Sequence, residues 1–338
     1  MALHRIKKGF DVKIIGAPKS EIQNFTSTNK YAVYPTEFEG IKPRLLVKVG
    51  DKVKRGQVLF FNKRMDRTVF RSPCCGTISA INLGARRFPS EILIDLDINE
   101  ESESFEKYTT ESVLQLEREV LTSHLLNIVM WPLIKQRPFN KIADPDTIPK
   151  AIFVNAANSA PYQADFGLIL QGDENYFQAG INALSCLTKG KVYICKSANI
   201  TIPEFDNSET HTLLGKYPSG NTSVHINRIS PITPNDTVYT ITAQDVIILG
   251  KALNDGEIPR TKVVALAGPG FKEAARKYYR VPFGASLEKL FEDNLDGDEV
   301  RLINGNVMWG NQVTHKTCAH YYGSEYFGVG SVSTSHCD

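Results

Sequence analysis

Residues 151–197 have the sequence AIFVNAANSAPYQADFGLILQGDENYFQAGINALSCLTKGKVYICKS, and this stretch determines the fold that we predict. Ala151–Asn155 is short, apolar and partly β-branched, which is typical of a buried strand. A polar loop follows, and beyond Gly172 apolar residues recur at helical spacing, which predicts a helix with one apolar face. These residues are Phe177, Ile181, Leu184 and Leu187.

A second strand is expected directly after this helix. Gly190 stands where a glycine that caps the end of a helix would belong, and Val192–Cys195 is apolar again. Strand, loop, helix and strand in this order form a βαβ unit with parallel strands. Because ligands of such units usually meet the loop after the first strand, residues 156–165 are the first place to look for a site.

The composition excludes several classes of protein. The chain has 338 residues, with 39 basic and 37 acidic side chains, and a net charge of +2 gives no electrostatic case for a nucleic-acid partner. We find no apolar run of membrane-spanning length and no apolar signal core near the N-terminus, so we expect a cytoplasmic protein. The six cysteines form no CxxC pair and are expected to be reduced thiols.

The N-terminal part, residues 1–105, is predicted to be a β domain. Val47–Leu59 (VKVGDKVKRGQVL) and residues 71–84 (RSPCCGTISAINLG) each carry glycines between apolar residues, which favours two short strand pairs in a small sandwich. The pattern resembles the biotinyl/lipoyl carrier fold. Counting along the motif places the tip of the carrier hairpin at Met65–Asp66, with Lys63 nearby, so we interpret the domain as a structural module and keep a lipoyl or biotin carrier as an alternative.

Residues 106–258 are predicted to form a Rossmann-like α/β domain with a linker helix. The helix is expected to begin at Glu111 and to end before Pro132. Ala198–Pro234 is predicted to be irregular, with a turn at residues 217–221. Thr242 is expected to cap a helix over Ala243–Leu253, which Gly256 closes.

Residues 259–330 are predicted to form a small β-rich module. We expect strands at Lys262–Ala267, Arg276–Pro282 and Val300–Asn304, and one short helix capped by Ser286. Residues 331–338 are interpreted as a tail.

No motif for metal or nucleotide chemistry stands out. His315, Cys318 and His320 fit no common zinc spacing, and Asp296, Asp298 and Glu299 are too close together for a calcium loop. Gly268-Pro-Gly270 follows an apolar strand, but Pro269 removes an amide donor that a phosphate would need. We therefore expect no metal site, no bound cofactor and no catalytic residue.

The loop after the first strand resembles the flavin site of the flavoprotein subunit of respiratory complex I. Asn155, Pro161 and Asp165 match the frame of that family's loop. The positions that are acidic in that family are occupied here by Ala157, Asn158 and Ala160. The family's glycine-rich phosphate loop corresponds to Pro132–Phe139, PLIKQRPF, which has no glycine. Bulky side chains there would hold a phosphate away from the backbone, so the resemblance implies a vestigial flavin pocket.

Taken together, the segments resemble the A subunits of the sodium-translocating NADH:quinone oxidoreductases. The shared landmarks are IKKG at Ile6–Gly9, RPF at Arg137–Phe139, GKVYICKS at Gly190–Ser197, YPSG at residues 217–220, QDVI at Gln244–Ile247 and VPFGAS at Val281–Ser286. The resemblance implies a protein without its own redox centre, with a β-grasp soluble-ligand-binding module at residues 259–330. It also implies integral membrane subunits as partners, a peripheral position on the cytoplasmic side of the inner membrane, and a C-terminal helical domain that we expect this chain to lack.

The resemblance further suggests quinone as a ligand. A quinone needs a flat apolar wall and one or two hydrogen-bond donors. We hypothesise that Phe139 is the wall, that Arg137, Lys141 and Asn158 are donors, and that Trp131 extends the apolar side. Two alternatives remain open: Phe139 and Trp131 merely fill the space that flavin would occupy, or the chain is itself a flavin- and NADH-binding dehydrogenase.

Overall fold

A computed structural model describes residues 2–25, 28–98, 100–297 and 299–330. The chain divides into two compact units. Unit 1 comprises Met1–Phe10, Val33–Ser159 and Asp165–Arg260, and unit 2 comprises Asp11–Ala32, Ala160–Ala164 and Thr261–Asp338. Asp298, Cys337 and the tail 331–338, which were interpreted from the sequence, lie outside the described residues.

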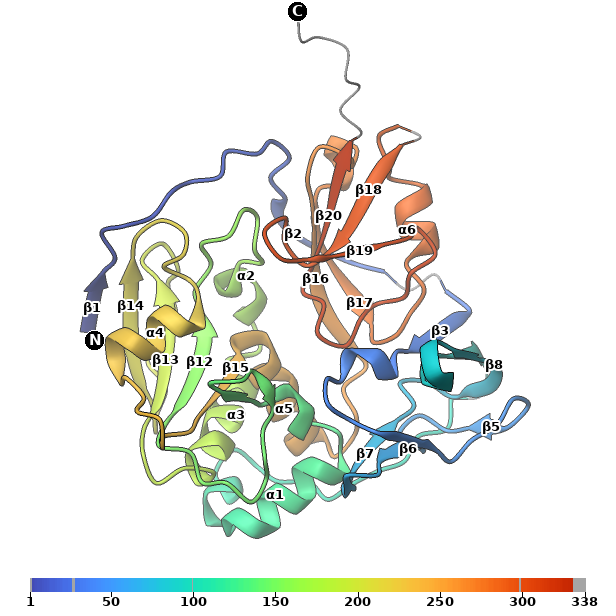
Figure 1. The fold of residues 1–338 in the computed structure, drawn as a ribbon, viewed down its shortest axis with the longest axis horizontal. Helices are drawn as coiled ribbons and strands as arrows, with labels where there is room; N and C mark the ends of the chain where they lie inside the picture. Colours follow the sequence, from blue (N-terminus) through green and yellow to red (C-terminus); the bar gives the residue numbers. More distant parts are fainter. Residues whose placement is uncertain (1, 26–27, 99, 298, 331–338) are drawn as a thin grey trace, which may run out of the picture. The chain divides into compact units, whose positions relative to one another are not determined.

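Unit 1 contains a seven-stranded sheet in the order β1-β14-β13-β12-β15-β10-β11 (Figure 1). Its strands are β1 (Ala2–Arg5), β10 (Lys135–Arg137), β11 (Lys141–Ile142), β12 (Ile152–Ala156), β13 (Val192–Ser197), β14 (Glu209–Leu214) and β15 (Val238–Thr242). Neighbouring strands from β1 to β15 run parallel, whereas β10 and β11 form an antiparallel hairpin at one edge.

The predicted βαβ unit is confirmed. Between β12 and β13 the chain forms α2 (Phe166–Leu170) and α3 (Glu174–Cys186), and the two strands pair in parallel. The four apolar residues that predicted the helix are all fully buried. Parallel strands buried on both faces need side chains such as those of Ile152, Phe153 and Val154, none of which is exposed to solvent.

The role predicted for Gly190 is wrong. The helix ends at Cys186 with Leu187 as its C-cap, before the glycine is reached. A Cβ atom at position 190 would lie 1.9 Å from the carbonyl oxygen of Lys150, so the glycine is required by the close approach of two backbone segments.

The long helix predicted from Glu111 is broken into shorter pieces. They are η3 (Ser112–Gln115), α1 (Arg118–Asn127) and η4 (Trp131–Leu133). Leu116 and Glu117 have extended backbones, and Val129 has a positive φ of 62°, so the helical hydrogen bonds stop on both sides of α1. The apolar periodicity predicted one continuous helix face, but it could not show that the helix is interrupted on both sides of α1.

Residues 198–234 are more regular than predicted. They contain β14 and the helix α4 (Thr222–Ile229). On one face of the sheet, Ile226 of α4 belongs to a buried cluster with Phe153, Cys195 and Val238. The next helix, α5 (Ala243–Asp255), has the predicted caps: Thr242 accepts a bond from the amide of Asp245, and Gly256 has φ 63°.

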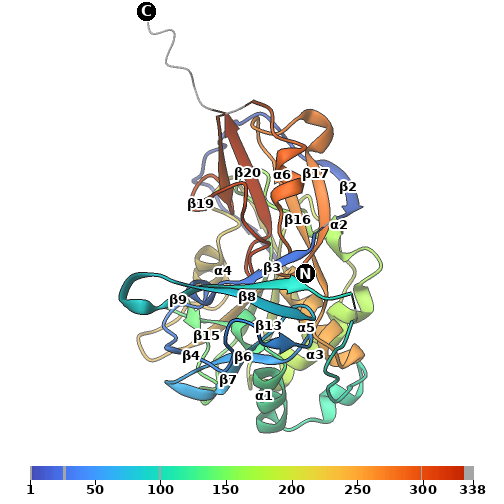
Figure 2. The same cartoon turned by 90° about the vertical axis from the view of Figure 1, so that its right-hand side faces the viewer.

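Two small sheets make up the N-terminal sandwich, in the orders β3-β9-β8-β5 and β4-β6-β7. Their strands are β3 (Lys30–Val33), β4 (Pro43–Leu45), β5 (Lys52–Val53), β6 (Val58–Asn62), β7 (Met65–Arg71), β8 (Gly76–Leu83) and β9 (Pro89–Leu96), with short turns η1 (Pro35–Glu37) and η2 (Ala85–Arg87). Figure 2 shows β8 and β9 as a long hairpin. In the core, Phe60 stacks on Phe70, and Phe38 packs against Phe70 at a tilt.

The predicted position of the hairpin tip in this sandwich is wrong. Asn62 pairs with Met65, so the turn is formed by Lys63 and Arg64 rather than by Met65 and Asp66. Counting residues from both ends of the motif assumed regular strands, but the β6–β7 register shifts at two places. Lys63 is therefore a tip residue.

Unit 2 contains a six-stranded sheet in the order β19-β18-β20-β16-β17-β2. Its elements are β2 (Lys19–Asn24), β16 (Thr261–Ala267), β17 (Lys277–Pro282), β18 (Val300–Asn304), β19 (Asn311–Val313), β20 (Glu325–Gly330), η5 (Glu273–Ala275) and α6 (Glu288–Glu292). The three predicted strands and the short helix are present; the N-cap residue is Leu287, one residue after the predicted Ser286. Leu290 and Phe291 of α6 pack into the core of this unit.

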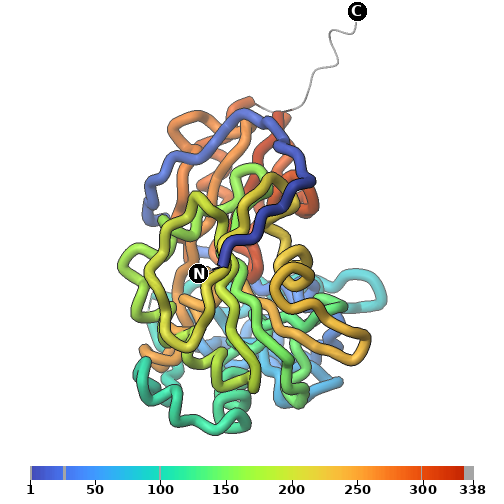
Figure 3. Tube along the Cα trace, turned by 90° about the vertical axis from the view of Figure 1, so that its left-hand side faces the viewer, coloured from blue at the N-terminus to red at the C-terminus, as the bar shows by residue number. Residues whose placement is uncertain are grey.

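Two N-terminal strands pair with segments more than 200 residues away. β1 lies parallel to β14, and Figure 3 shows this first segment in dark blue beside the yellow-green strand. β2 pairs in parallel with β17. Over the part of the chain that the structure describes, no helix is both long and apolar enough to span a bilayer.

Candidate functional site

The loop after β12 is held in place by the side chain of Asn155. Its Nδ2 donates to the carbonyl of Gly220 at 3.1 Å and to Oγ1 of Thr222 at 3.0 Å. Its Oδ1 accepts from the amide of Ala157 at 3.0 Å. These bonds tie the carboxyl end of the strand to the first turn of α4.

The next residues of the loop, Asn158 and Ser159, also form hydrogen bonds within the protein. The hydroxyl of Ser197 donates to the carbonyl of Asn158 at 3.0 Å and accepts from its amide at 2.9 Å. The amide of Gly220 donates to the Ser159 hydroxyl at 2.7 Å. A side chain at position 220 would collide with this serine, since its Cβ would lie 2.7 Å from Oγ. The backbone that would face a ligand is therefore bonded to the protein itself.

Pro161 and Asp165 complete the frame predicted from the flavoprotein loop. Pro161 stands in the turn before α2, and the Asp165 carboxylate accepts from the amide of Gly167 at 2.8 Å, which makes it the N-cap of that helix. Ala157 and Ala160, which replace acidic residues of the flavoprotein pattern, are buried. The frame residues thus have local structural roles.

The β10–β11 hairpin carries the other predicted site residues. Phe139 lies in its turn and is 80% exposed, so the alternative that it fills an interior space is wrong. Lys141 is exposed. Trp131 is fully buried, and its indole N–H donates to the carbonyl of Ala143 at 2.8 Å, so it packs beneath the hairpin and does not face solvent.

Arg137 ends β10 and lines a pocket of about 220 Å³. The other lining residues come from the hairpin, from α4 and from the segment that follows α4: Pro138, Ser223, Ile226, Asn227, Pro231 and Ile232. Among the described residues the buried Nε of Arg137 has no hydrogen-bond partner. Burial lowers the pKa of this guanidinium. The pocket thus combines apolar side chains with a cationic one.

The structure does not bring Arg137 and Asn158 together. In the sheet, Arg137 lies level with Val238 at the amino end of β15, whereas Asn155 lies level with Thr242 at its carboxyl end. Four residues of strand correspond to roughly 13 Å, and Asn158 follows still further along. Sequence order could not show this, because it depends on the antiparallel pairing of β10 with β15.

Sequence reasoning missed Ser223 and Asn227, because α4 was not predicted. One signal was present: Asn221 stands at the N-cap position, and Val224, Ile226 and Ile229 are partly spaced as on a helix face. His225 of the same helix is fully buried and bonds to the carbonyl of Ser219 at 2.9 Å, and burial lowers its pKa to about 4. This histidine is neutral and structural.

In unit 2, the glycine pair after β16 is engaged by backbone bonds. The amide of Gly268 donates to Gly16 at 2.8 Å, and that of Gly270 donates to Gly328 at 2.9 Å. Of the histidines around Cys318, His320 contacts the Thr317 hydroxyl at 3.1 Å, and Cys318 is itself buried.

The chain matches known domain families along most of its length. Three domain families match the chain in order: the NqrA N-terminal barrel-sandwich hybrid domain over residues 4–97, the NqrA second alpha/beta domain over 116–258, and the NQRA C-terminal domain over 263–315. The class is therefore a mixed α/β protein with a barrel-sandwich hybrid domain at its N-terminus.

Curated relatives agree along most of the chain. The A subunit of the Na(+)-translocating NADH-quinone reductase of Saccharophagus degradans is 35% identical over 93% of this chain and 70% of its own length. The corresponding protein of Psychromonas ingrahamii is 38% identical over 97% of this chain and 72% of its own length. The chain belongs to the family of the A subunits of the Na(+)-translocating NADH-quinone reductases.

The similarity to a solved hydrogenase structure is weak. A chain of an NAD+-reducing [NiFe]-hydrogenase in the air-oxidized state is 11% identical, with a TM-score of 0.42 over 69% of this chain and 52% of that chain. A similarity at this level carries no argument about function.

Proposed function

We propose that this chain is part of a sodium-pumping NADH:quinone reductase, in which it binds quinone and holds no redox centre of its own. It contributes to an oxidoreductase complex without supplying a catalytic residue. Its partners are the other subunits, including integral membrane subunits, and it lies peripherally on the cytoplasmic side of the inner membrane. Membership of the A-subunit family, whose relatives carry the name of such a reductase, supports this assignment.

The observation that carries the quinone proposal is the pocket at Arg137. A quinone headgroup is a flat ring with two carbonyl acceptors, so it needs an apolar wall and donors. Ile226 and Ile232 supply apolar surface, and Ser223, Asn227 and Arg137 add polar groups to the lining. At about 220 Å³ the pocket is smaller than the roughly 300–1,000 Å³ of typical ligand pockets, which suits a single ring better than a dinucleotide.

The other residues predicted to bind quinone have different roles in this proposal. Phe139 and Lys141 belong to the same hairpin as Arg137 and are exposed, so they are placed to contact the quinone tail or the second carbonyl outside the pocket. Trp131 supports the hairpin from beneath through Ala143. Asn158, at the opposite end of the sheet, takes no part in this pocket.

The test compares Arg137→Ala with Arg228→Ala, a matched control. Arg228 is an exposed arginine of α4 that does not line the pocket. We expect Arg137→Ala to weaken binding of a short-tailed ubiquinone analogue by about 1–3 kcal/mol, because a hydrogen bond to a charged donor is lost. Phe139→Ala should cost on the order of 1 kcal/mol. Calorimetry or ligand-observed NMR on the folded chain measures both.

Wild-type affinity in both the Arg137→Ala and the Arg228→Ala variant would place quinone elsewhere. A loss that appears equally in both arginine variants would indicate a general effect of charge and would also contradict the proposal. Circular dichroism of each variant separates loss of binding from loss of fold.

We propose further that the α/β domain is Rossmann-like and related to the flavoprotein subunit of complex I. The parallel order β14-β13-β12-β15, in which the chain crosses back over β12, supports this relation. The mixed sheet of unit 2 with α6 packed on its core supports a β-grasp soluble-ligand-binding module. Domain boundaries at 1–105, 106–258 and 259–330, with a tail at 331–338, complete this proposal.

One observation favours a second candidate function, a lipoyl or biotin carrier, because Lys63 stands at the tip of the β6–β7 hairpin. The flanking residues argue against modification. The side chain of Asn62 accepts from the amides of Lys42 and Arg64 at 2.9 and 3.1 Å, which ties the tip to the sandwich instead of presenting it freely. We rank this candidate second.

A further inference from the structure

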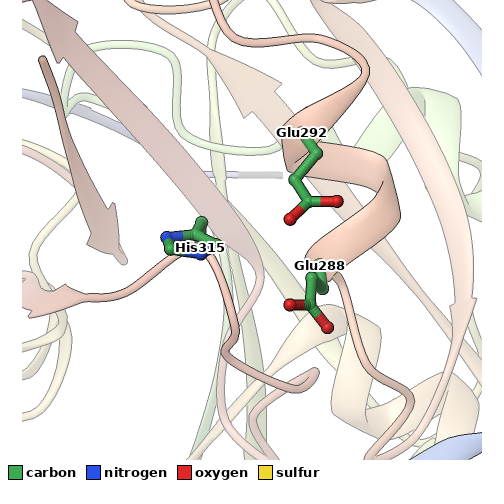
Figure 4. Close-up of side chains that lie close together, drawn as sticks. All are labelled: Glu288, Glu292 and His315. Carbon is green, nitrogen blue, oxygen red and sulfur yellow. The ribbon is translucent and has the colours of Figure 1, made fainter. Parts of the chain in front are cut away.

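Three side chains that can bind a metal ion gather on the surface of unit 2. Glu288 and Glu292 lie one turn apart on α6, and His315 comes from the segment after β19. One possible ligand atom of each lies within 4.8 Å of the others. Figure 4 shows both carboxylates and the imidazole on the same side of α6. The histidine is far from both glutamates in sequence, which is why spacing alone predicted no site.

Backbone bonds hold the two segments side by side. The amide of Leu287 donates to the carbonyl of Thr317 at 3.0 Å, and that of Ala319 donates to Ala285 at 2.8 Å. Leu290 and Phe291 anchor the opposite side of α6 in the core. The separation between the carboxylates and His315 is therefore set by buried structure, and only the exposed ends of the side chains need to adjust.

The two carboxylates of this cluster have no ion-pair partner among the described residues. Two carboxylates four residues apart on a helix repel each other. A cation held between them would turn this repulsion into attraction.

We propose that Glu288, Glu292 and His315 form a binding site for a divalent transition-metal ion, with Zn²⁺ as the preferred ion. Calcium and magnesium favour sets made of oxygen alone, whereas an imidazole nitrogen with carboxylate oxygens suits zinc. Three protein ligands leave a fourth position open for water or for a group of a partner. The ion would link α6 to the segment around His315. This inference is independent of the quinone proposal.

The test is calorimetric titration of the 338-residue chain with Zn²⁺, and with Mg²⁺ in parallel. We expect one Zn²⁺ site that is weakened at least about tenfold by His315→Gln and by Glu292→Gln, since loss of an outer partner alone costs about 10–100-fold. Two matched controls should leave this site within about twofold. They are Glu299→Gln, which changes an exposed carboxylate of the same unit, and His320→Gln, which changes a nearby histidine outside the cluster.

Because Glu292 and His315 are exposed, their variants should melt like the wild type when no metal is present, and added Zn²⁺ should raise the melting temperature of the wild type alone. The proposal is overturned if the wild type binds no Zn²⁺, if it binds Mg²⁺ equally well, or if both ligand variants retain wild-type affinity. In the last case the ion would be held by other groups, such as the thiols.

Discussion

At the scale of single residues, Glu325 shows how burial changes a carboxyl group. It begins β20 with only 6% of its surface exposed, and its Oε2 accepts from the amide of Ala164 at 3.3 Å. Burial raises its pKa to about 7, although the bonds from Ala164, Asn306 and Ser324 act in the opposite direction. The folded protein therefore binds a proton here over a range of pH in which the unfolded chain does not.

This predicts a specific dependence of stability on pH. Because the folded pKa is raised, the contribution of this carboxyl to stability is fully present below about pH 4.5 and is lost as the pH rises through about 7. We expect the free energy of unfolding of the wild type to fall by about 3 kcal/mol over this window, relative to Glu325→Gln, which carries no titrating group.

Urea unfolding of both proteins between about pH 5 and 8 measures this difference. The exposed Glu299→Gln is the control and should follow the wild type. Parallel curves for the wild type and Glu325→Gln would show that the carboxyl is already ionised when buried.

At the scale of elements, close packing of α3 and α5 depends on glycines that face each other. A Cβ at Gly250 would lie 1.8 Å from the carbonyl oxygen of Tyr176, and one at Gly180 would lie 2.3 Å from that of Val246. These atoms belong to backbone, which cannot move aside as a flexible side chain can. The two helices meet at a distance that only glycine permits.

We therefore predict that Gly250→Ala lowers the free energy of unfolding by about 1–3 kcal/mol, although alanine is the better helix former. Gly84→Ala is the control, because the nearest atom to its added Cβ lies at 3.6 Å and its φ is −88°. Denaturant melts compare the two. A neutral or stabilising Gly250→Ala would mean that the helices can separate at little cost.

The same scale shows what the sequence could and could not predict. The helix α5 was predictable to within two residues, because Thr242 and Gly256 are local signals at its two ends. The helix α4 was missed although its apolar residues favour one face, because it has only eight residues and Asn221 makes no side-chain capping bond; its lining residues of the pocket at Arg137 were missed with it. Local signals also could not show that β10 pairs with β15 in antiparallel fashion, which separates Arg137 from Asn158.

At the scale of the whole molecule, the fold depends on pairings between distant parts of the chain. β1 completes the edge of a sheet formed by residues 135–242, and β2 pairs with β17. The sequence of such a short strand does not predict which other strand it pairs with. Motifs, in contrast, could identify the family, because several of them occur in order along the chain, and the curated relatives confirm that identification.

For the purified chain we predict neither bound flavin nor a covalent cofactor. The glycine-free segment Pro132–Phe139 gives a flavin phosphate no close backbone, and the Asn62 bonds hold Lys63 in the hairpin turn. The visible spectrum should show no flavin bands after mild purification, and intact mass should equal that of the sequence. Stoichiometric flavin absorbance would support the dehydrogenase alternative, and a mass increase at Lys63 would support the carrier.

The central claim, that the chain works within a sodium-pumping NADH:quinone reductase, is tested most directly by purifying the tagged chain from its native membranes in mild detergent. We predict that the integral subunits of the reductase elute with it in fixed proportion, together with NADH:quinone reductase activity that sodium stimulates. Elution of the chain without those subunits, while the reductase activity remains in the membrane fraction, would contradict the account.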